Sequence, residues 1–485
     1  MNRRELLKAG LAAGLGSLWP WSSARTTASS GTRRAQNVIF FAYDGLTWED
    51  IGSARTYAER HLDKPLAFDR LFARSSAGSM NSSSLTSVTT DSAAASTAWA
   101  TGQKIVSGLL NMYPDGTTLE PILRLAQQKG LATGLITTTR LTHATPAGWY
   151  AQIDWRRREE DIALQLVDTP PEVLLGGGHR ALDANQREDG RDVYADFADQ
   201  GFTLVRDNSE LVEANASKLL GVFHDSHIPY EIDRRFQDVS APTLETMVDA
   251  GLQVLSGYDR GFLVQIEAGR IDHANHRNDA GGSLWEVLAA DAALDVAMAY
   301  VDAHPDTLLI TASDHGTGGG TVYGVGARYR EGSTTHDHIT KCTASFPYIV
   351  DRMQEDPVPP HVKEVAEQYT GVRMTGEQAA LMVRALHDDL AMPNLQAYDR
   401  QPYNTLAHCL RGGTYDNPDR LNINFATGQH TAGPVPVAAY GAGADALQIG
   451  LVDNTDLYEW VTTALDINYQ NPSMTPETAL EALSG

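Results

Sequence analysis

Cysteine is nearly absent from this chain of 485 residues, which contains only Cys342 and Cys409. Two cysteines exclude a zinc–thiolate centre and allow at most one disulfide, whose formation the sequence does not decide. Hydrophobic runs of membrane-spanning length are absent too, because the apolar stretch from Ala9 to Trp21 is short and rich in glycine. The sequence therefore predicts a soluble protein without a membrane anchor.

Lysine is also scarce. Seven of the 38 basic side chains are lysine, against 61 acidic ones, and the formal net charge is -23. Nucleic acids and anionic membranes reward clusters of basic residues, so neither is expected as a partner. The same balance is typical of a surface adapted to high salt, and equally of a genome that favours arginine over lysine. The first interpretation predicts activity and melting temperature that rise as salt approaches molar levels.

The rest of the composition is that of a large globular α/β protein, with 42% hydrophobic residues and 42 glycines. We expect a single catalytic domain over residues 31–485, preceded by an export signal over residues 1–30. The signal has paired arginines, Arg3 and Arg4, followed by an apolar run and then small polar residues. It resembles a twin-arginine signal, which exports proteins already folded and so suits a metalloprotein. The mature protein is therefore expected to be periplasmic or extracellular.

Hydrophobic runs of strand length alternate with segments of helical spacing through most of the chain. Seven runs are almost continuously apolar, as is typical of strands buried on both faces: Val38–Tyr43, Leu131–Thr137, Glu172–Leu175, Phe202–Val205, Phe262–Ile266, Leu308–Thr311 and Val435–Tyr440. Four segments between them have helical periodicity: Leu119–Lys129, Glu159–Val167, Leu244–Leu255 and Leu284–Ala303. This alternation predicts an α/β fold with a large, mostly parallel central sheet flanked by helices on both faces. Residues 316–427 lack this alternation of strand-length and helical segments. We therefore expect them to form an insertion over the active-site face.

Polar side chains stand where the predicted strands end, which is where ligands collect in a doubly wound sheet. They are Asp44, His143, Thr145, Glu267, Asp272, His276, Asp314, His315 and His430. Each one alone would be an ordinary turn residue or helix cap. Together they form a set of carboxylates and imidazoles suited to more than one divalent cation.

The spacing within this set favours particular ions. Asp272 and His276 are four residues apart, so a helix would present both side chains to one ion. Asp314 and His315 are adjacent and can converge on a metal from a turn at the end of a strand. Zinc suits such combinations of nitrogen and carboxylate ligands. Magnesium suits the oxygen-rich members of the set, which are Asp44, Thr145 and Glu267.

Ser92 stands at the head of an alanine-rich segment of helical length. A helix that begins there would offer unpaired N–H groups and the positive end of its dipole, which stabilise an oxyanion attached to the serine. Ser92 is therefore a candidate nucleophile for a phosphate group. The alternative is an ordinary N-cap serine, which is common at the start of a helix.

Two segments resemble the signatures of the alkaline phosphatase family, and the resemblance extends from Val38 to Gly441. One is Thr-Asp-Ser-Ala-Ala-Ala-Ser-Thr-Ala-Trp-Ala-Thr-Gly around Ser92, and the other is Val-Gln-Ile-Glu-Ala-Gly-Arg-Ile-Asp-His-Ala-Asn-His at 264–276. The resemblance implies two zinc ions and one magnesium ion, with Ser92 beside the second zinc. The implied ligands are Asp272, His276 and His430 for the first zinc, Asp44, Asp314 and His315 for the second, and Asp44, Thr145 and Glu267 for magnesium.

Three further positions are interpreted through the same resemblance. His143 stands where the family has aspartate or histidine, so it contacts the third ion either directly or through water, and that ion could be a transition metal instead of magnesium. His273 stands where lysine or tryptophan also occurs, and we expect it outside the direct ligands. Family spacing selects Arg156, from the run of arginines at 156–158, as the residue that binds two phosphate oxygens.

The resemblance implies an exported, metal-dependent hydrolase of small phosphate monoesters that acts through a phosphoserine at Ser92. Two alternatives stay open: a phosphodiesterase of the same superfamily, and an exported metal- or phosphate-binding protein without turnover. A sulfatase would need a Cys/Ser-x-Pro-x-Arg context, which the residues after Ser92 lack. The family is often a symmetric dimer, so a homodimer is also expected.

Overall fold

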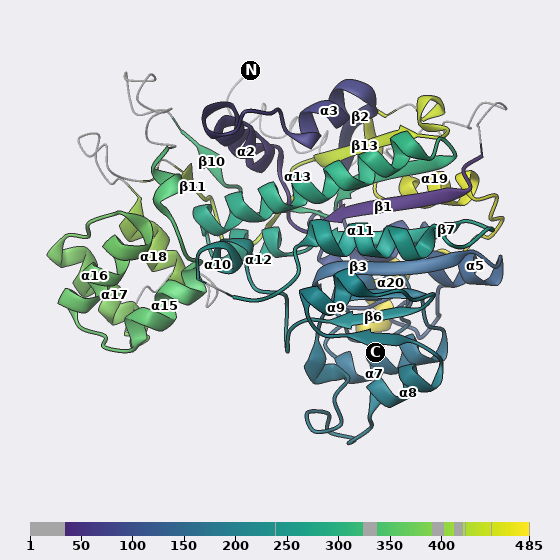
Figure 1. Cartoon of the computed structure of the whole chain (residues 1–485), viewed down its shortest axis with the longest axis horizontal. Helices are drawn as coiled ribbons and strands as arrows, with labels where there is room; N and C mark the ends of the chain where they lie inside the picture. Colours follow the sequence, from purple (N-terminus) through teal and green to yellow (C-terminus); the bar gives the residue numbers. More distant parts are fainter. Residues whose placement is uncertain are drawn as a thin grey trace, which may run out of the picture.

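The computed structural model describes residues 34–237, 239–323, 337–389, 402–411, 421, 423–447 and 449–484. The predicted export signal at 1–30 lies outside these residues. Within them, no helix has both the length and the apolar character needed to cross a membrane. A ten-stranded sheet runs through the molecule, and helices pack against it (Figure 1).

The sheet is mostly parallel, and β13 is the strand that pairs antiparallel with both of its neighbours. The strand order is β14 (Leu451–Asp453), β2 (Ser76–Asn81), β13 (Val435–Gly441), β8 (Thr307–Ser313), β1 (Asn37–Tyr43), β7 (Phe262–Ala268), β3 (Ala132–Arg140), β4 (Val173–Gly177), β6 (Leu219–Val222) and β5 (Thr203–Val205). Every residue of the central strands β1, β7 and β8 is buried. The predicted α/β fold with a large, mostly parallel sheet is confirmed.

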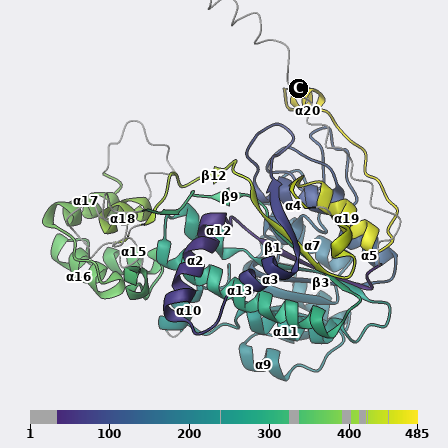
Figure 2. The same ribbon diagram turned by 90° about the horizontal axis from the view of Figure 1, so that it is seen from above.

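Side chains of β1 alternate between two apolar layers, one on each face of the sheet. Ile39 and Phe41 enter the first layer, and Val38 and Phe40 enter the second. The first layer is covered by α2 (Trp48–His61), α3 (Ala67–Arg74), α11 (Leu244–Leu255) and α13 (Ala280–Ala303). The second is covered by α4 (Ser92–Thr101), α5 (Ile122–Gln128), α7 (Glu159–Asp168), α8 (Val193–Asp199) and α19 (Asp456–Ala464). Figure 2 shows the two sets of helices on opposite sides of β1 and β3.

Short elements follow the strands at one edge of the sheet. They are α6 (Ala144–Ala147), α10 (Glu231–Phe236), α12 (Arg270–His276), β9 (Gly316–Thr317) and β12 (His430–Thr431). β9 and β12 pair antiparallel, with His430 opposite Thr317. Two short helices lie away from this edge. They are α9 (Asn208–Glu213), which lies beside β6, and α20 (Pro476–Ser484), which ends near the C-terminus (Figures 1 and 2).

A helical lobe interrupts the strand–helix rhythm between β9 and β12. It contains α15 (Phe346–Gln354), α16 (Pro359–Thr370), α17 (Gly376–Leu386) and α18 (Pro402–Leu410), and it extends beyond α12 in Figure 1. Strands β10 (Thr321–Val322) and β11 (Ile423–Asn424), which precede and follow this lobe in the chain, pair antiparallel with each other. This lobe falls within the predicted insertion at 316–427. Cys342 and Cys409 are buried within the same predicted insertion, and Sγ of Cys409 donates to the Gln378 carbonyl oxygen at 3.6 Å.

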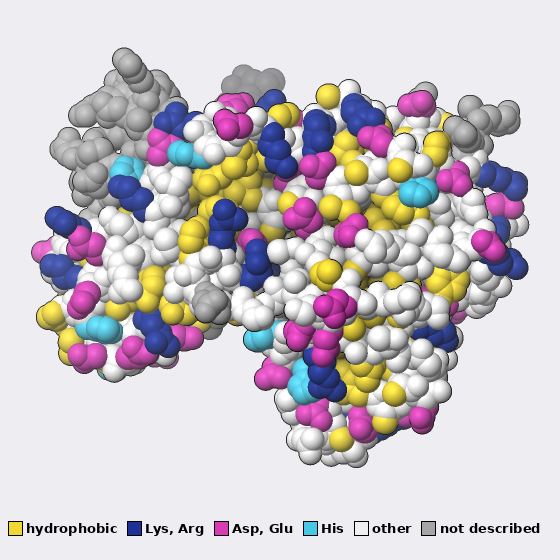
Figure 3. Space-filling view, in the orientation of Figure 1, with side chains coloured by type: hydrophobic (Ala, Val, Ile, Leu, Met, Phe, Trp, Pro, Cys, Tyr) yellow, Lys and Arg dark blue, Asp and Glu magenta, His cyan; other side chains and the backbone are white. Residues whose placement is uncertain are grey.

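Acidic and basic side chains are interspersed on the face of the molecule that Figure 3 shows. Several of them form ion pairs, such as Arg70 with Asp295 and Arg74 with Asp302. Exposed ion pairs of this kind contribute little to stability. The fold therefore depends mainly on the two apolar layers around the sheet.

Candidate active site

Three acidic residues lie at the carboxyl ends of three neighbouring strands. The register pairs Tyr43 of β1 with Ser313 of β8, so Asp44 and Asp314, the next residues of each chain segment, lie side by side. Glu267 of β7 pairs with Ala42 of β1, on the side of β1 opposite to β8. All three carboxylates are fully buried. The ends of the central strands thus gather charge where ligands usually bind in such sheets.

Gly45 brings this edge of the sheet against α12. Its φ is 76°, and a Cβ atom at this position would lie 2.7 Å from Cα of Asp272. Only glycine satisfies both the left-handed backbone and the close approach. The turn after β1 therefore places Asp44 next to the helix that carries Asp272 and His276.

Ser92 is the first residue of α4, and it is not the N-cap. Asp91 occupies the cap position, where its Oδ1 accepts a hydrogen bond from the Ala94 N–H at 3.0 Å. The Ser92 hydroxyl instead lies 3.4 Å from Nε2 of His315, and the residue is 2% exposed. The N-cap alternative for Ser92 is therefore wrong, because the neighbouring aspartate takes that role.

The predicted ligands come together in three groups whose donor atoms lie within 4.8 Å of one another. The first is Asp272, His276 and His430, the second is Asp44, Asp314 and His315, and the third is Asp44, His143 and Glu267. Asp44 is shared by two groups. The first two are the sets that the family resemblance implies, and the third joins His143 to Asp44 and Glu267 of the implied magnesium set.

Hydrogen bonds orient the histidines of the first group toward one point. Nδ1 of His276 lies 2.7 Å from the Gly428 carbonyl oxygen, and Nδ1 of His430 lies 2.7 Å from the Thr90 carbonyl oxygen. A carbonyl oxygen can only accept, so each Nδ1 carries a proton, and in the neutral ring each Nε2 presents a lone pair. The two Nε2 atoms lie 3.1 Å apart. Such second contacts are what fix metal-binding imidazoles in their ligating tautomer.

The chemistry of these residues fits divalent cations. Oδ1 of Asp44, Oδ2 of Asp314 and Oε1 of Glu267 are buried, and none has a hydrogen-bond partner among the described residues. Burial, and then the carboxylates of Asp314 and Asp272, raise the pKa of Asp44 well above its ordinary value. Burial raises the pKa of Glu267 to about 7. Bound cations would satisfy these oxygens and remove the mutual repulsion of the acids.

Imidazoles at the site are also suited to ligation. Burial, and then the neighbouring His315, lower the pKa of His430 to about 4, so its ring is neutral at neutral pH. Nε2 of His315 lies 3.1 Å from Oδ2 of Asp314 and 3.7 Å from Oδ1 of Asp44. Neither carboxylate oxygen accepts a hydrogen bond there. This geometry is expected when three atoms are directed at a common ion.

The third group is rich in oxygen, as the sequence analysis predicted for magnesium. Oγ1 of Thr145 lies 3.5 Å from Oδ2 of Asp44. Thr137 and Thr139 both donate hydrogen bonds to Oε2 of Glu267, the second at 2.8 Å, which leaves Oε1 directed elsewhere. His143 stands just before α6, at the edge of this group.

Arg156 lies beside Ser92 and is held by Asp91. Its Nη1 donates to Oδ2 of Asp91 at 2.9 Å, and its Nη2 lies 3.3 Å from Nε2 of His143. The Arg156 side chain is 20% exposed, so solvent reaches it. One carboxylate thus caps α4 and positions the arginine, which links Ser92 to a cation suited to phosphate.

His273 lies apart from the ligand groups, although it shares α12 with Asp272. Its ring is 5.5 Å from that of His143 and 4.3 Å from that of His227, between centroids. Arg270 Nη1 is 3.0 Å from its Nδ1. Burial, and then the charge of Arg270, hold the pKa of His273 well below its ordinary value. It is a neutral ring beside the third group.

Sequence reasoning missed three neighbours of the site. Asp91 precedes Ser92 and was passed over as part of the helix signature. Thr139 belongs to a strand whose hydroxyls gave no signal of their own. His227 comes from the loop between β6 and α10, and its Nε2 accepts a hydrogen bond from Arg140. Nothing in the sequence pattern places that loop beside α12.

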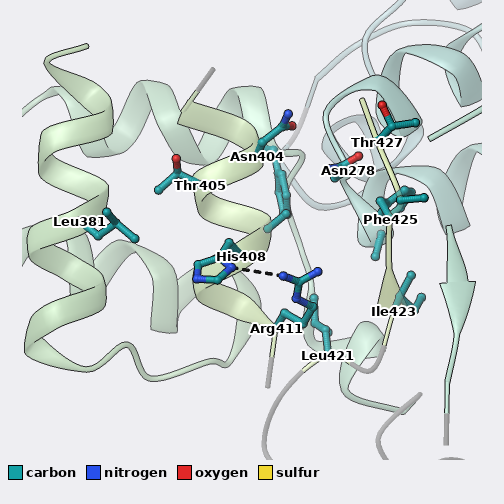
Figure 4. Close-up of a pocket in the computed structure, with 14 residues that line it drawn as sticks. Asn278, Leu381, Asn404, Thr405, His408, Arg411, Leu421, Ile423, Phe425 and Thr427 are labelled. Atoms are coloured by element: carbon teal, nitrogen blue, oxygen red, sulfur yellow. Dashed lines mark hydrogen bonds between the residues drawn. The ribbon is translucent and has the colours of Figure 1, made fainter. Parts of the chain in front are cut away.

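A separate cavity of about 440 Å³ lies between the helical lobe and β11 (Figure 4). His408 and Arg411 lie side by side at the α18 end of its wall, with Nδ1 and Nη2 3.2 Å apart. Phe425 and Thr427 line the other side. None of the predicted site residues lines this cavity.

Comparison with known proteins gives consistent results. A family model described as alkaline phosphatase matches residues 35–467. The crystal structure of Thermus thermophilus alkaline phosphatase is similar with a TM-score of 0.92 and 44% identity, over 96% of this chain and 100% of that one.

Two curated relatives are more distant. Alkaline phosphatase 3 of Bacillus subtilis is 28% identical, over 93% of each chain. The repressible alkaline phosphatase of Saccharomyces cerevisiae is 32% identical, over 60% of this chain and 56% of the yeast protein. The match therefore spans little more than half the length of the yeast relative.

Proposed function

The chain belongs to the alkaline phosphatase family of metal-dependent phosphatases, and from that premise we propose that it hydrolyses small phosphate monoesters through a phosphoserine at Ser92. The observation that carries the proposal is the position of Ser92 at the start of α4. Its hydroxyl lies 3.4 Å from Nε2 of His315, and the anchored guanidinium of Arg156 stands beside it.

The proposed metal complement is two Zn²⁺ and one Mg²⁺. Zinc would be held by Asp272, His276 and His430 and by Asp44, Asp314 and His315, which combine nitrogen and carboxylate ligands. Magnesium would be held by Asp44, Thr145 and Glu267, with His143 contacting it directly or through water. When bound, these cations would supply Lewis-acid stabilisation for the attacking and leaving oxygens.

Residues of the chain then account for binding and attack. Arg156 binds two nonbridging oxygens of the phosphate, and Asp91 keeps the guanidinium in place. The N–H groups at the start of α4 stabilise negative charge next to Ser92. The serine oxygen forms a bond to phosphorus as the bond to the alcohol oxygen breaks, and the alcohol leaves with a proton. Water then opens the phosphoserine, releasing phosphate and restoring the serine hydroxyl.

The remaining predictions are proposed on the same basis. Residues 1–30 act as an export signal, the mature protein works in the periplasm or outside the cell, and residues 31–485 form one catalytic domain with an insertion at about 316–427. A homodimer is the expected assembly. Small-molecule monoesters are the proposed substrates.

The test is hydrolysis of a simple aryl phosphate monoester at alkaline pH by the purified protein. Activity should disappear on chelation and return when zinc and magnesium are added together. Rapid acid quench should then trap phosphate on Ser92. Turnover of diesters in place of monoesters would favour a phosphodiesterase, and stoichiometric phosphate capture without turnover would favour a binding protein.

A further inference from the structure

Trp155 is an exposed aromatic residue immediately before the proposed phosphate-binding arginine. Its exposed fraction is 47%, whereas Trp99 and Trp149 of the same region are fully buried. Burying an indole contributes more than burying almost any other side chain, so a tryptophan left half in water contributes little of its area to folding.

The indole is seated on Gly108 in a way that requires glycine there. Gly108 has φ of 92°, and a Cβ atom on it would lie 2.7 Å from Cζ3 of Trp155. The Gly108 N–H donates to Oδ2 of Asp91 at 3.1 Å, and its carbonyl accepts from the Arg156 N–H at 2.8 Å. The backbone that positions Asp91 and Arg156 therefore also supports the tryptophan ring.

Exposure falls steadily along this chain of contacts. Trp155 is 47% exposed, the side chains of Asp91 and Arg156 are each 20% exposed, and Ser92 is 2% exposed. This order of decreasing exposure leads from solvent to the nucleophile, as expected for the entrance of a site. The alcohol part of a bound ester must point outward along this path, because its phosphate lies at the buried end.

Val88 lies in the loop that precedes α4, three residues before Asp91. It is 77% exposed, more than any other large apolar residue among those described. The same loop holds His430 through the Thr90 carbonyl oxygen. Exposed apolar side chains thus occur in both segments that contribute to the site, Val88 shortly before Ser92 and Trp155 just before Arg156.

We infer that Trp155 binds the alcohol part of the substrate and favours phosphate monoesters of aryl alcohols and nucleosides over those of small polyols. The inference rests on the proposed function, since it concerns the same site. A planar ring can stack on the indole, and a glycerol chain cannot. The Arg157 guanidinium lies over the Trp155 ring, 5.8 Å from the ring centroid.

The kinetic test compares phenyl phosphate with glycerol phosphate. In Trp155→Ala, the ratio of kcat/KM for phenyl phosphate to that for glycerol phosphate should fall roughly three- to tenfold, the range of one aromatic stacking contact. The loss should appear in KM rather than kcat, because both substrates share the same phosphoserine. Trp155→Phe should restore most of the ratio.

Trp48→Ala is the matched control. Trp48 is 38% exposed, but its ring packs on Phe72 and donates to Oγ of Ser79. This variant should keep the wild-type ratio. If Trp155→Ala also kept it, or if Trp48→Ala lowered it equally, the inference would be overturned.

A binding experiment separates this inference from the proposed function. Calorimetry with the metal-loaded protein should show tighter binding of phenylphosphonate than of methylphosphonate, and Trp155→Ala should remove that preference. Neither compound has a bond that the enzyme can hydrolyse. A preference without any monoester turnover would refute the proposed function and leave the inference standing, whereas turnover without a preference would refute the inference alone.

Discussion

Nε2 of His276 and Nε2 of His430 lie 3.1 Å apart. Carbonyl oxygens of Gly428 and Thr90 hold the two rings in this position through their Nδ1 atoms. A cation bound by both neutral rings would take the place of any proton between the two Nε2 atoms. The site is therefore arranged in advance for an ion that binds nitrogen.

Removal of this ion should destabilise the protein. Chelation should lower Tm, and zinc at about one hundred times its Kd should restore about 2.7 kcal/mol of stability. His430→Ala should bind one zinc fewer, which can be measured by mass spectrometry under native conditions. Equal zinc content in His430→Ala and the wild type would contradict this assignment of ligands.

Ser92→Ala should abolish the covalent intermediate. Loss of a nucleophile that acts with the rest of its site typically costs more than a thousandfold in kcat. The measurement is acid-quench trapping of labelled phosphate, with Ser87→Ala as the control because that serine is exposed in the preceding loop. Near-normal turnover by Ser92→Ala would rule out the serine mechanism.

Arg156→Lys should show that geometry matters at this position and charge alone does not suffice. Lysine keeps the charge but cannot donate two parallel hydrogen bonds to phosphate or hold Asp91 in the same way. We expect kcat/KM to fall by about a hundredfold. Arg157→Lys, at an exposed position, should have a small effect on methyl phosphate. A similar loss in both variants would refute the role of Arg156.

Thr139→Val should weaken binding of the third ion. The two hydroxyls of Thr137 and Thr139 hold Oε2 of Glu267, so that Oε1 is directed into the third group. Loss of such a contact typically weakens metal affinity about tenfold or more. Calorimetric titration with Mg²⁺ measures it directly. Thr133→Val, on the same strand but bonded to Glu172, should bind Mg²⁺ like the wild type.

The strands could be predicted where burial on both faces made them continuously apolar. β2 was missed because its sequence, Ser-Ala-Gly-Ser-Met-Asn, has one large apolar residue. Its strand conformation depends on pairing with β13 and β14, which come more than 300 residues later. Local patterns carry no information on such pairing.

Site residues could be predicted where a strand end or a helical spacing placed them. Asp44 and Asp314 follow buried strands, and Asp272 and His276 share one helix face. His227 and Thr139 could not be found in this way, because their importance comes from contacts with Arg140 and Glu267 across the fold. Trp155 is visible in the sequence, but its exposure is not.

Glu286 provides a test of stability that is independent of the metal site. It is buried in α13, where its Oε1 accepts a hydrogen bond from the Glu231 N–H at 2.7 Å. Burial raises its pKa to about 8. The folded protein therefore keeps this proton at pH values where the unfolded chain has lost it, and the stabilisation is fully present below the unfolded pKa. Stability should fall as pH rises toward 8, with a slope of at most about 1.4 kcal/mol per pH unit from this group.

Glu286→Gln should remove that slope, because an amide keeps the acceptor oxygen and has no charge to gain. Urea unfolding between pH 5 and pH 9 measures it as the difference between variant and wild type, which should grow in favour of the variant as pH rises. Glu245→Gln, at an exposed position on α11, is the control and should run parallel to the wild type. A difference between Glu286→Gln and wild type that stays constant with pH would show that Glu286 is ionised in the folded protein throughout this range. Such a result would require a cation close enough to outweigh its burial, and Arg270, whose charge lowers the pKa of Glu286, would be the residue to test next.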